Sequence, residues 1–343
     1  MNGSPLFSVI VPCCDVAPYV GECIESVRRQ GASFEAIVVV EESRDATERA
    51  VREAVAGDSR FSVIVEPRSG SPSTPRNTGL AAAKGDYIVF LDGDDTLAEG
   101  ALEDIAAFIE RYPGVDLLPG AVVEGEKVYD NYPCDLAKLP MTGVEAGLCV
   151  ARHNVEPMPM AQMTVCRRAF LLGHALRFVD GLRHEDEEFP PRALYLAAGV
   201  VPTHLKFYLY RRRADSITTA RKERNLSDIA IVYRSLFRFH AEVKPAAEVS
   251  RGWARNWLNT FFNAFFFPAR SSVRVSEHRA SALKALFAEG FGDFDRLVRH
   301  ASKAKRIGAA LMRFAVRTGW YAPADFYFSR VYYPLAMRRS SGR

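Results

Sequence analysis

The sequence lacks the features that most directly indicate a metal site or a membrane protein. Its six cysteines form no Cys-x-x-Cys pair, and no spacing of cysteine and histidine matches a zinc site. No run of about 18 apolar residues is present, which argues against a membrane-spanning helix. The first residues carry no basic stretch ahead of an apolar segment, as a secretion signal would. We therefore expect a cytoplasmic protein with reduced thiols.

Net charge is also small, but it is unevenly distributed. The 343 residues carry a formal net charge of +4 and are 48% hydrophobic. This composition excludes a disordered chain and a uniform polycation of the kind that binds nucleic acid. Residues 1–200 carry a net charge of −13 and residues 201–343 a net charge of +17. The asymmetry predicts that the two parts of the chain face different partners.

Short apolar runs alternate with helical patterns in the first part of the chain. We expect strands at 7–11, 36–40, 61–65 and 87–91, with helices at 20–30 and 46–56 and a third from residue 76. This alternation predicts an α/β fold, with a mainly parallel sheet between helices. Residues 115–205 are less regular, and from residue 226 the sequence turns helical, basic and aromatic. We therefore expect an α/β domain at 1–225 and a mainly helical region at 226–343.

The ends of the predicted strands bring acidic residues together. Glu41 and Glu42 follow the second strand, and Asp92-Gly93-Asp94-Asp95 follows the fourth. Parallel strands bind ligands beyond their carboxyl ends, so these carboxylates are expected at one edge of the sheet. A divalent ion with oxygen ligands would relieve their repulsion and hold phosphates. The alternative is that the acidic residues occupy solvated turns.

Two further segments carry charge that chemistry could use. Arg76 lies near the start of the third predicted helix, where it could meet a phosphate together with backbone N–H groups; a surface arginine is the alternative. Four consecutive carboxylates, Glu185–Glu188, are expected in a loop. One of them could act as a general base in a cleft, and a solvated turn is again the alternative.

The order of these segments resembles that of inverting family 2 glycosyltransferases of the bacterial capsule and exopolysaccharide type, which have the GT-A fold. The segments that carry the resemblance are 8–15, 41–43, 75–79, 84–95, 185–186 and 210–218. Together they span about residues 7–220. Glu41-Glu42 stands where these enzymes have an acidic Asp pair, and Cys13-Cys14 replaces their usual Val-Tyr. Packing is the alternative for both thiols, since a buried cysteine behaves as a small apolar residue.

The resemblance implies a role for each matching residue. The residues expected to bind the nucleotide sugar are Pro12, Cys13, Glu42, Arg76, Asp92, Gly93, Arg211 and Arg213. Asp94, together with Asp92, is expected to hold Mn²⁺ or Mg²⁺ against the diphosphate. Asp186 is expected to be the catalytic base.

The implied reaction is inverting transfer of a sugar from a nucleotide-diphosphate sugar to a hydroxyl acceptor. UDP is the commonest nucleotide of such donors, and the acceptor is expected to be a lipid-linked or growing glycan. Two alternatives remain. The protein could be a non-catalytic subunit that binds nucleotide sugars. Asp92 and the residues after it also fit the Asp-x-Asp-x-Thr motif of haloacid-dehalogenase-type phosphatases, in which the first Asp attacks phosphate.

The basic C-terminal part offers one further interpretation. Within 303–317, apolar residues recur at helical spacing, namely Ile307, Ala310, Leu311, Phe314 and Ala315, with lysine and arginine around them. An anionic membrane surface, at the inner face of the cell membrane, and packing within the protein both fit this pattern. A second group of residues, Trp253, Trp257, Phe261, Phe262 and Phe265–Phe267, fits a helical core better than a membrane belt.

Overall fold

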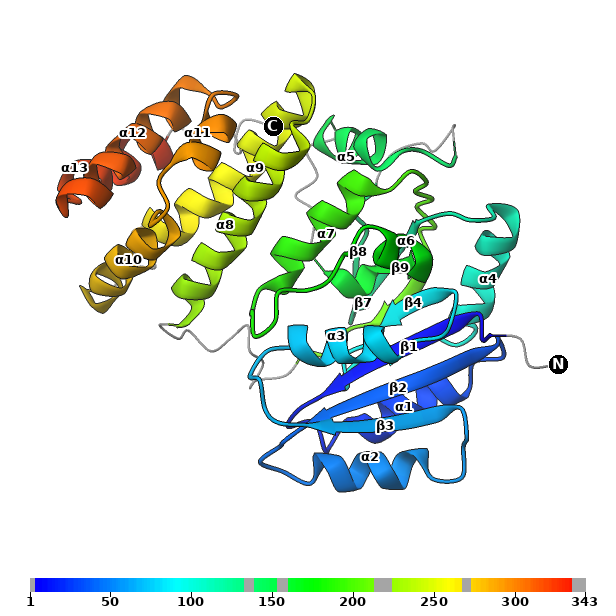
Figure 1. Ribbon diagram of the computed structural model, residues 1–343. Coiled ribbons are helices and arrows are strands. Elements are labelled where there is room, and N and C mark those ends of the chain that lie inside the picture. Colours follow the sequence, from blue (N-terminus) through cyan, green and yellow to red (C-terminus); the bar gives the residue numbers. More distant parts are fainter. Residues whose placement is uncertain (1–3, 133–138, 153–159, 213–223, 267–272, 335–343) are drawn as a thin grey trace. The chain divides into compact units, whose positions relative to one another are not determined.

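The computed structural model describes residues 4–132, 139–152, 160–212, 224–266 and 273–334 (Figure 1). The chain forms two compact units, Met1–Thr219 and Ala220–Arg343. The first contains both strands and helices, whereas the described part of the second contains only helices. The sequence places the division a few residues later, at 225.

A six-stranded sheet forms the centre of the first unit. Its strands are β1 (Phe7–Cys13), β2 (Phe34–Glu41), β3 (Phe61–Glu66), β4 (Tyr87–Phe90), β6 (Leu117–Pro119) and β9 (Thr164–Arg167). They lie in the order β3-β2-β1-β4-β9-β6. The first four pair in parallel, and β9 runs antiparallel to β4 and β6. The four predicted strands are confirmed, and their carboxyl ends share one edge of the sheet.

Helices cover both faces of this sheet (Figure 1). Successive side chains of a strand point to opposite faces, so Val9 and Ile10 of β1 belong to different cores. The core around Val9 includes residues of α1 (Val20–Arg28), α2 (Thr47–Val55) and α4 (Ala101–Arg111). The core around Ile10 includes residues of α3 (Ser73–Ala82), α5 (Gly143–Arg152), α6 (Arg168–Gly173) and α7 (Glu185–Leu196). The sheet therefore lies between helices, as the sequence predicts.

A second, smaller sheet was not predicted. Its strands are β5 (Thr96–Leu97), β7 (Ala121–Glu124), β8 (Lys127–Tyr129) and β10 (Lys206–Leu209), in the order β5-β10-β7-β8. Each has two to four residues, which is too short for a period of two to be recognised. A short helix, η1 (Ala161–Met163), precedes β9. The Asp92–Asp95 loop lies between β4 of the large sheet and β5 of the small one.

The second unit is built from helices with an aromatic core. Its described elements are α8 (Arg224–Val243), α9 (Ala247–Phe266), α10 (Val273–Leu286), α11 (Gly292–Val298), α12 (Lys303–Thr318), α13 (Ala322–Tyr327) and a turn of π-helix, η3 (Phe328–Tyr332). Trp257 and Phe261 are buried, and Trp253 stacks on Trp257 with ring centroids 4.4 Å apart. The interpretation of these aromatics as core is confirmed, except for Phe267, which lies outside the described residues. None of the helices described has the length and apolar character needed to cross a membrane.

Helix α12 packs through a different face from the one its large apolar residues suggest. Of the five predicted apolar positions only Ala315 is buried, whereas Ile307 and Phe314 are each 42% exposed. The buried face consists mainly of small residues, because α12 lies very close to its neighbour. A Cβ added to Gly308 would lie 2.8 Å from Cζ of Phe328.

The described cysteines differ in their state. Cys13, Cys14, Cys23 and Cys166 are free. Cys149 is disulfide-bonded, so the expectation of reduced thiols is wrong at that residue.

Candidate active site

The ends of β1 and β4 meet at the edge where the acidic loop begins. The Gly93 N–H donates to the carbonyl oxygen of Pro12 at 3.2 Å. A Cβ at Gly93 would lie 2.8 Å from Sγ of Cys13, so this close approach favours glycine. Cys13 itself is buried, and burial raises the pKa of its thiol. Cys13 thus packs beneath the loop that carries Asp92 and Asp94.

Arg76 lies at the centre of the site rather than on its surface. Its side chain is 1% exposed, so the alternative of a surface arginine is wrong. Its Nη2 donates to Oδ1 of Asp92 at 2.7 Å, and its Nη1 hydrogen-bonds to Oε1 of Glu185 and lies 3.9 Å from Oδ1 of Asp186. Burial alone would lower the pKa of Arg76, but the three carboxylate charges outweigh it and raise that pKa.

The four consecutive carboxylates form the first turn of α7, not a loop. Glu185 and Glu188 are buried and pair with Arg76 and Arg192. Negative charge is favoured at this end of a helix, because the N-terminal N–H groups carry partial positive charge. The structure therefore gives two of the four carboxylates a structural role and leaves Asp186 beside Arg76.

Asp186 has the surroundings of a strong carboxylate base. Its side chain is a quarter exposed, and its Oδ1 accepts a hydrogen bond from the Ala161 N–H at 2.9 Å. Poor solvation of the carboxyl, followed by the charge of Glu185, raises the pKa of Asp186 well above its ordinary range. Arg76 and the Ala161 N–H oppose this shift and favour the charged form.

Gln162 belongs to the site and was missed by sequence reasoning. It is buried, and its Nε2 donates to Oδ2 of Asp92 at 2.5 Å. The neighbouring Ala161 N–H holds Asp186, so the short helix η1 contacts both acids. A lone glutamine in a three-residue helix gives no sequence signal. Asp92 accepts from Arg76 through one oxygen and from Gln162 through the other, so these two donors fix the orientation of its carboxylate.

Helix α3 explains why the segment around Arg76 has its particular residues. Asn77 makes paired hydrogen bonds with the Phe178 backbone, donating to the carbonyl oxygen at 2.9 Å and accepting from the N–H at 3.0 Å. Ser73 Oγ donates to the Leu182 carbonyl oxygen at 2.7 Å. Gly79 lies against β1, where a Cβ would approach Cγ2 of Ile10 to 2.3 Å. These contacts bring the chain before Asp186 to the edge of the sheet.

The last acid of the loop, Asp95, is held by the small sheet. Tyr208 Oη donates to Asp95 at 2.5 Å, and the Arg211 N–H donates to it at 2.7 Å. Burial, together with the charges of Asp92 and Asp94, raises the pKa of Asp95 to about 8. Tyr208 was not predicted, because β10 is too short to recognise in the sequence.

Of the two predicted arginines near β10, the structure describes Arg211. Its guanidinium hydrogen-bonds to Glu22 and lies 5.2 Å from the ring centroid of Tyr19, at the start of α1. Its backbone contact with Asp95 places it beside the acidic loop. Arg213 lies outside the described residues.

The two glutamates after β2 have different environments. Glu41 is buried, and its carboxylate accepts a hydrogen bond from the Ser69 N–H at 2.7 Å. The Glu42 side chain is exposed, and its N–H continues the pairing with β3 through the Glu66 carbonyl oxygen at 3.0 Å. Of this pair, only Glu42 is therefore accessible to a ligand.

The acidic loop fits a metal that takes part of its coordination from substrate. Within the described ranges, no group of three or more histidine, cysteine, aspartate or glutamate residues is placed to hold a metal ion. Asp92 and Asp94 supply two carboxylates, whose charges add to the effect of burial in raising the pKa of Asp95. Mg²⁺ is commonly held by one or two carboxylates together with phosphates and water. Two carboxylates beside a diphosphate would match that pattern.

Comparison with known proteins identifies the first unit. Residues 8–171 match the family model described as glycosyl transferase family 2. The first unit belongs to this family. It is accordingly a glycosyltransferase domain, and the resemblance inferred from the sequence is confirmed.

Several bacterial glycosyltransferases are similar to the chain. Glycosyltransferase GlyG of Streptococcus pneumoniae is 28% identical over 228 residues, covering 62% of this chain and 73% of that protein. The poly(ribitol-phosphate) beta-N-acetylglucosaminyltransferase TarS of Staphylococcus aureus is 36% identical over 224 residues, but the match spans only 37% of TarS. The succinoglycan biosynthesis protein ExoO of Rhizobium meliloti is 28% identical over 334 residues, which cover 91% of this chain and 88% of ExoO.

A solved structure shows the fold of the chain. Residues 1–349 of S. aureus TarS superpose with a TM-score of 0.73 at 21% identity, covering 94% of this chain and 91% of that one. The same TarS fragment has been solved with UDP-GlcNAc. The predicted GT-A fold, with a helical C-terminal region, is thus confirmed.

Proposed function

We propose that the chain transfers a sugar from a nucleotide-diphosphate sugar, foremost a UDP-sugar, to a hydroxyl of a lipid-linked or growing glycan, with inversion at the anomeric carbon. The observation that carries the proposal is the position of Asp186, with its raised pKa, beside the Asp92–Asp94 loop. The TarS structure in complex with UDP-GlcNAc supports the choice of donor. Bacterial surface polysaccharide synthesis fits the relatives found.

Asp186 would act as the general base. An acceptor hydroxyl ionises far above neutral pH, so it needs a base aligned with it. As the hydroxyl oxygen bonds to the anomeric carbon, its proton passes to Asp186 and the bond to the diphosphate breaks, with the electron pair leaving on the diphosphate. A raised pKa makes Asp186 a stronger base. Inversion follows, because the acceptor attacks from the side opposite the leaving group.

The buried residues around the base would set its geometry. The Arg76 guanidinium already lies against Asp92, Glu185 and Asp186. We therefore assign Arg76 to the positioning of both acids rather than to contact with the diphosphate. Pro12 and Glu42 lie at the strand ends where the nucleoside is expected. The backbone N–H of Arg211 contacts Asp95 of the acidic loop, and its guanidinium suits the leaving diphosphate.

Asp94, with Asp92, would hold Mn²⁺ or Mg²⁺. When bound, this ion neutralises the negative charge that the diphosphate gains on leaving. The half-buried carboxylate of Asp94 lies on the loop anchored by Gly93 and Asp95.

The location we propose is the cytoplasm, at the inner face of the cell membrane. The support is the concentration of positive charge in residues 201–343, since anionic lipids attract basic surfaces. A lipid-linked acceptor would be reached at that place.

The decisive test is the Asp186→Asn variant. A screen of nucleotide sugars by thermal shift, with Mn²⁺ present, first identifies the donor. We expect the variant to keep the donor-induced shift and to lose at least about 100-fold in release of nucleoside diphosphate, the usual range for a lost general base. The matched control is Glu187→Gln, which removes a carboxylate from the same helical turn and is expected to stay active.

Two results would contradict this function. Transfer at the wild-type rate by Asp186→Asn would show that Asp186 is not the base. Binding of a nucleotide sugar by the wild-type protein without turnover, with a range of glycan acceptors, would favour the non-catalytic subunit.

A further inference from the structure

Helix α12 presents large apolar side chains to solvent. Its small residues, such as Gly308 and Ala309, are buried, while Ile307 and Phe314 are each 42% exposed on the opposite side. Trp320, just after the helix, is 60% exposed, and its ring meets the Phe314 ring edge-on at 6.0 Å. Apolar side chains therefore lie together on this side of the second unit, with no described part of the chain covering them.

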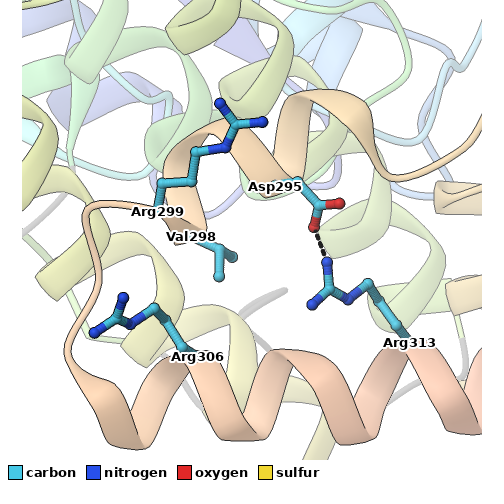
Figure 2. A pocket seen from close by; sticks show the side chains of 5 residues that line it. All are labelled: Asp295, Val298, Arg299, Arg306 and Arg313. Carbon is cyan, nitrogen blue, oxygen red and sulfur yellow. Dashed lines mark hydrogen bonds and ion pairs between the residues drawn. The ribbon is translucent and has the colours of Figure 1, made fainter.

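Arginines line a cavity beside these residues. The cavity, of about 320 Å³, lies between α11 and α12 and is lined by Asp295, Val298, Arg299, Arg306 and Arg313 (Figure 2). Its volume lies at the small end of ligand sites, which suits a small charged group. Because Arg306 precedes Ile307 and Arg313 precedes Phe314, the cavity borders the exposed apolar residues.

The charges of this cavity are not balanced. Arg313 pairs with Asp295 at 2.5 Å, the one carboxylate among the lining residues (Figure 2). Arg299 and Arg306 are exposed, and neither forms an ion pair with any described residue. Each of these two unneutralised guanidinium groups has five N–H donors that suit phosphate oxygens.

We propose that this surface docks on a bilayer of anionic phospholipid. We name it the α12 surface and define it by Arg299, Arg306, Ile307, Phe314 and Trp320. Arg299 and Arg306 meet lipid phosphates at the cavity, while Ile307, Phe314 and Trp320 enter the boundary between headgroups and acyl chains. Tryptophan is enriched at that boundary because its ring is amphipathic.

Charge complementarity selects this occupant. The neighbouring Lys303 and Arg317 are also exposed, so the apolar residues of α12 are surrounded by cations. A basic face with a few apolar side chains is the pattern of a helix that lies in a membrane interface. With only three large apolar residues, binding is reversible. The inference is independent of sugar transfer, because both the surface and its test concern lipid binding alone.

The test is flotation of the full chain with lipid vesicles. We expect binding to vesicles of mixed phosphatidylglycerol and phosphatidylcholine at low salt, loss of binding at high salt, and none to phosphatidylcholine alone. One basic residue near an anionic membrane changes affinity by about fivefold, so Arg299→Ser combined with Arg306→Ser should weaken binding on the order of 25-fold. Phe314→Ser combined with Trp320→Ser should weaken it as well.

Matched controls distinguish an effect of the α12 surface from a general effect of losing exposed positive charge or exposed apolar side chains. Arg234→Ser with Arg251→Ser removes two exposed cations from elsewhere in the same unit. Leu172→Ser removes an apolar side chain that is 51% exposed in the first unit. Both controls are expected to bind vesicles as the wild type does. Unchanged thermal unfolding of every variant confirms that it is folded.

Three outcomes would overturn the proposal. The first is equal flotation with anionic and neutral vesicles, or no flotation with either. The second is an equal loss of binding for the Arg299/Arg306 variant and the Arg234/Arg251 control, which would show that net charge alone determines binding. The third is a concentration-dependent oligomer that Phe314→Ser with Trp320→Ser dissociates, since a second copy of the chain would then cover the surface.

Discussion

At the scale of single residues, the candidate site depends on how one buried cation is shared. Arg76 contacts Asp92, Glu185 and Asp186, and Gln162 supplies a second donor to Asp92. Removing one partner of a buried ion pair costs about 3–5 kcal/mol, because an uncompensated charge is left behind. Substitution of Arg76 would therefore confound folding with activity. The neutral Gln162 is the better residue to test.

We predict that Gln162→Leu reduces kcat/KM by roughly tenfold, as expected for a buried acceptor that loses a donor worth about 1–3 kcal/mol. Leucine has a similar size but cannot donate to Asp92. Gln162→Glu is expected to be worse at neutral pH, because it places a second carboxylate against Asp92. Steady-state kinetics at several metal concentrations measures the effect of both substitutions. If Gln162 positions Asp92, its loss should also raise the metal concentration needed for half-maximal activity. Wild-type kinetics for Gln162→Leu would refute this role.

A second prediction at this scale concerns the metal. Excess EDTA should abolish release of nucleoside diphosphate, and Mn²⁺ or Mg²⁺ should restore it, because the leaving diphosphate would otherwise keep its full charge. Asp94→Asn should lose at least about tenfold in activity at limiting metal, since a neutral amide is a weaker ligand than a carboxylate. Thr96→Ser, just beyond the loop, serves as the control. Full activity in EDTA would rule out the metal.

At the scale of the elements, length decided what the sequence could predict. Strands β1 to β3, of six to eight residues, and the buried four-residue β4 were recognised because they form clear apolar runs. The strands of the small sheet have two to four residues and lack the continuous buried apolar run of β4, so they gave no signal, although β10 supplies Tyr208 to the site. Helix α12 was recognised, but its packed face was not. Close packing there depends on Gly308 meeting Phe328, a tertiary contact that periodicity cannot reveal.

The packing of α12 on α9 makes a prediction about pH. Lys305 is 8% exposed, and its Nζ donates to the Ala254 carbonyl oxygen at 3.2 Å. Burial lowers its pKa to about 7. Between that value and its ordinary value the unfolded chain binds more protons than the folded one, so stability should rise with pH in this range, by at most about 1.4 kcal/mol per pH unit.

Urea unfolding of the second unit at pH 7 and at pH 9 tests this prediction. Lys305→Met should make the free energy of unfolding less dependent on pH, because methionine packs like the lysine stem and does not titrate. Lys303→Met, at an exposed position of the same helix, should leave it unchanged. If the free energy of unfolding changes equally with pH in both variants, a group other than Lys305 titrates.

At the scale of the whole molecule, the near-neutral total charge combines two differently charged parts. The acidic part contains the carboxylates of the candidate site, and the basic part contains the α12 surface. The sequence located the acidic strand ends because parallel strands share an edge. It could not show that Arg76 is buried or that Gln162 joins Asp92, since both contacts depend on segments brought together only by the fold.

The ion pair between Arg76 and Glu185 also constrains the order in which the chain can assemble during synthesis. The two residues are 109 positions apart. While the ribosome is still adding the residues between Asp92 and Glu185, α3 can settle on the sheet only with a buried guanidinium that has Asp92 as its single carboxylate partner. Strands β1 to β4 emerge first, yet they must remain loosely covered until the start of α7 appears. A chain terminated before Glu185 would lack α7 and leave part of the core around Ile10 uncovered, and nascent fragments of that length should be recognised by chaperones.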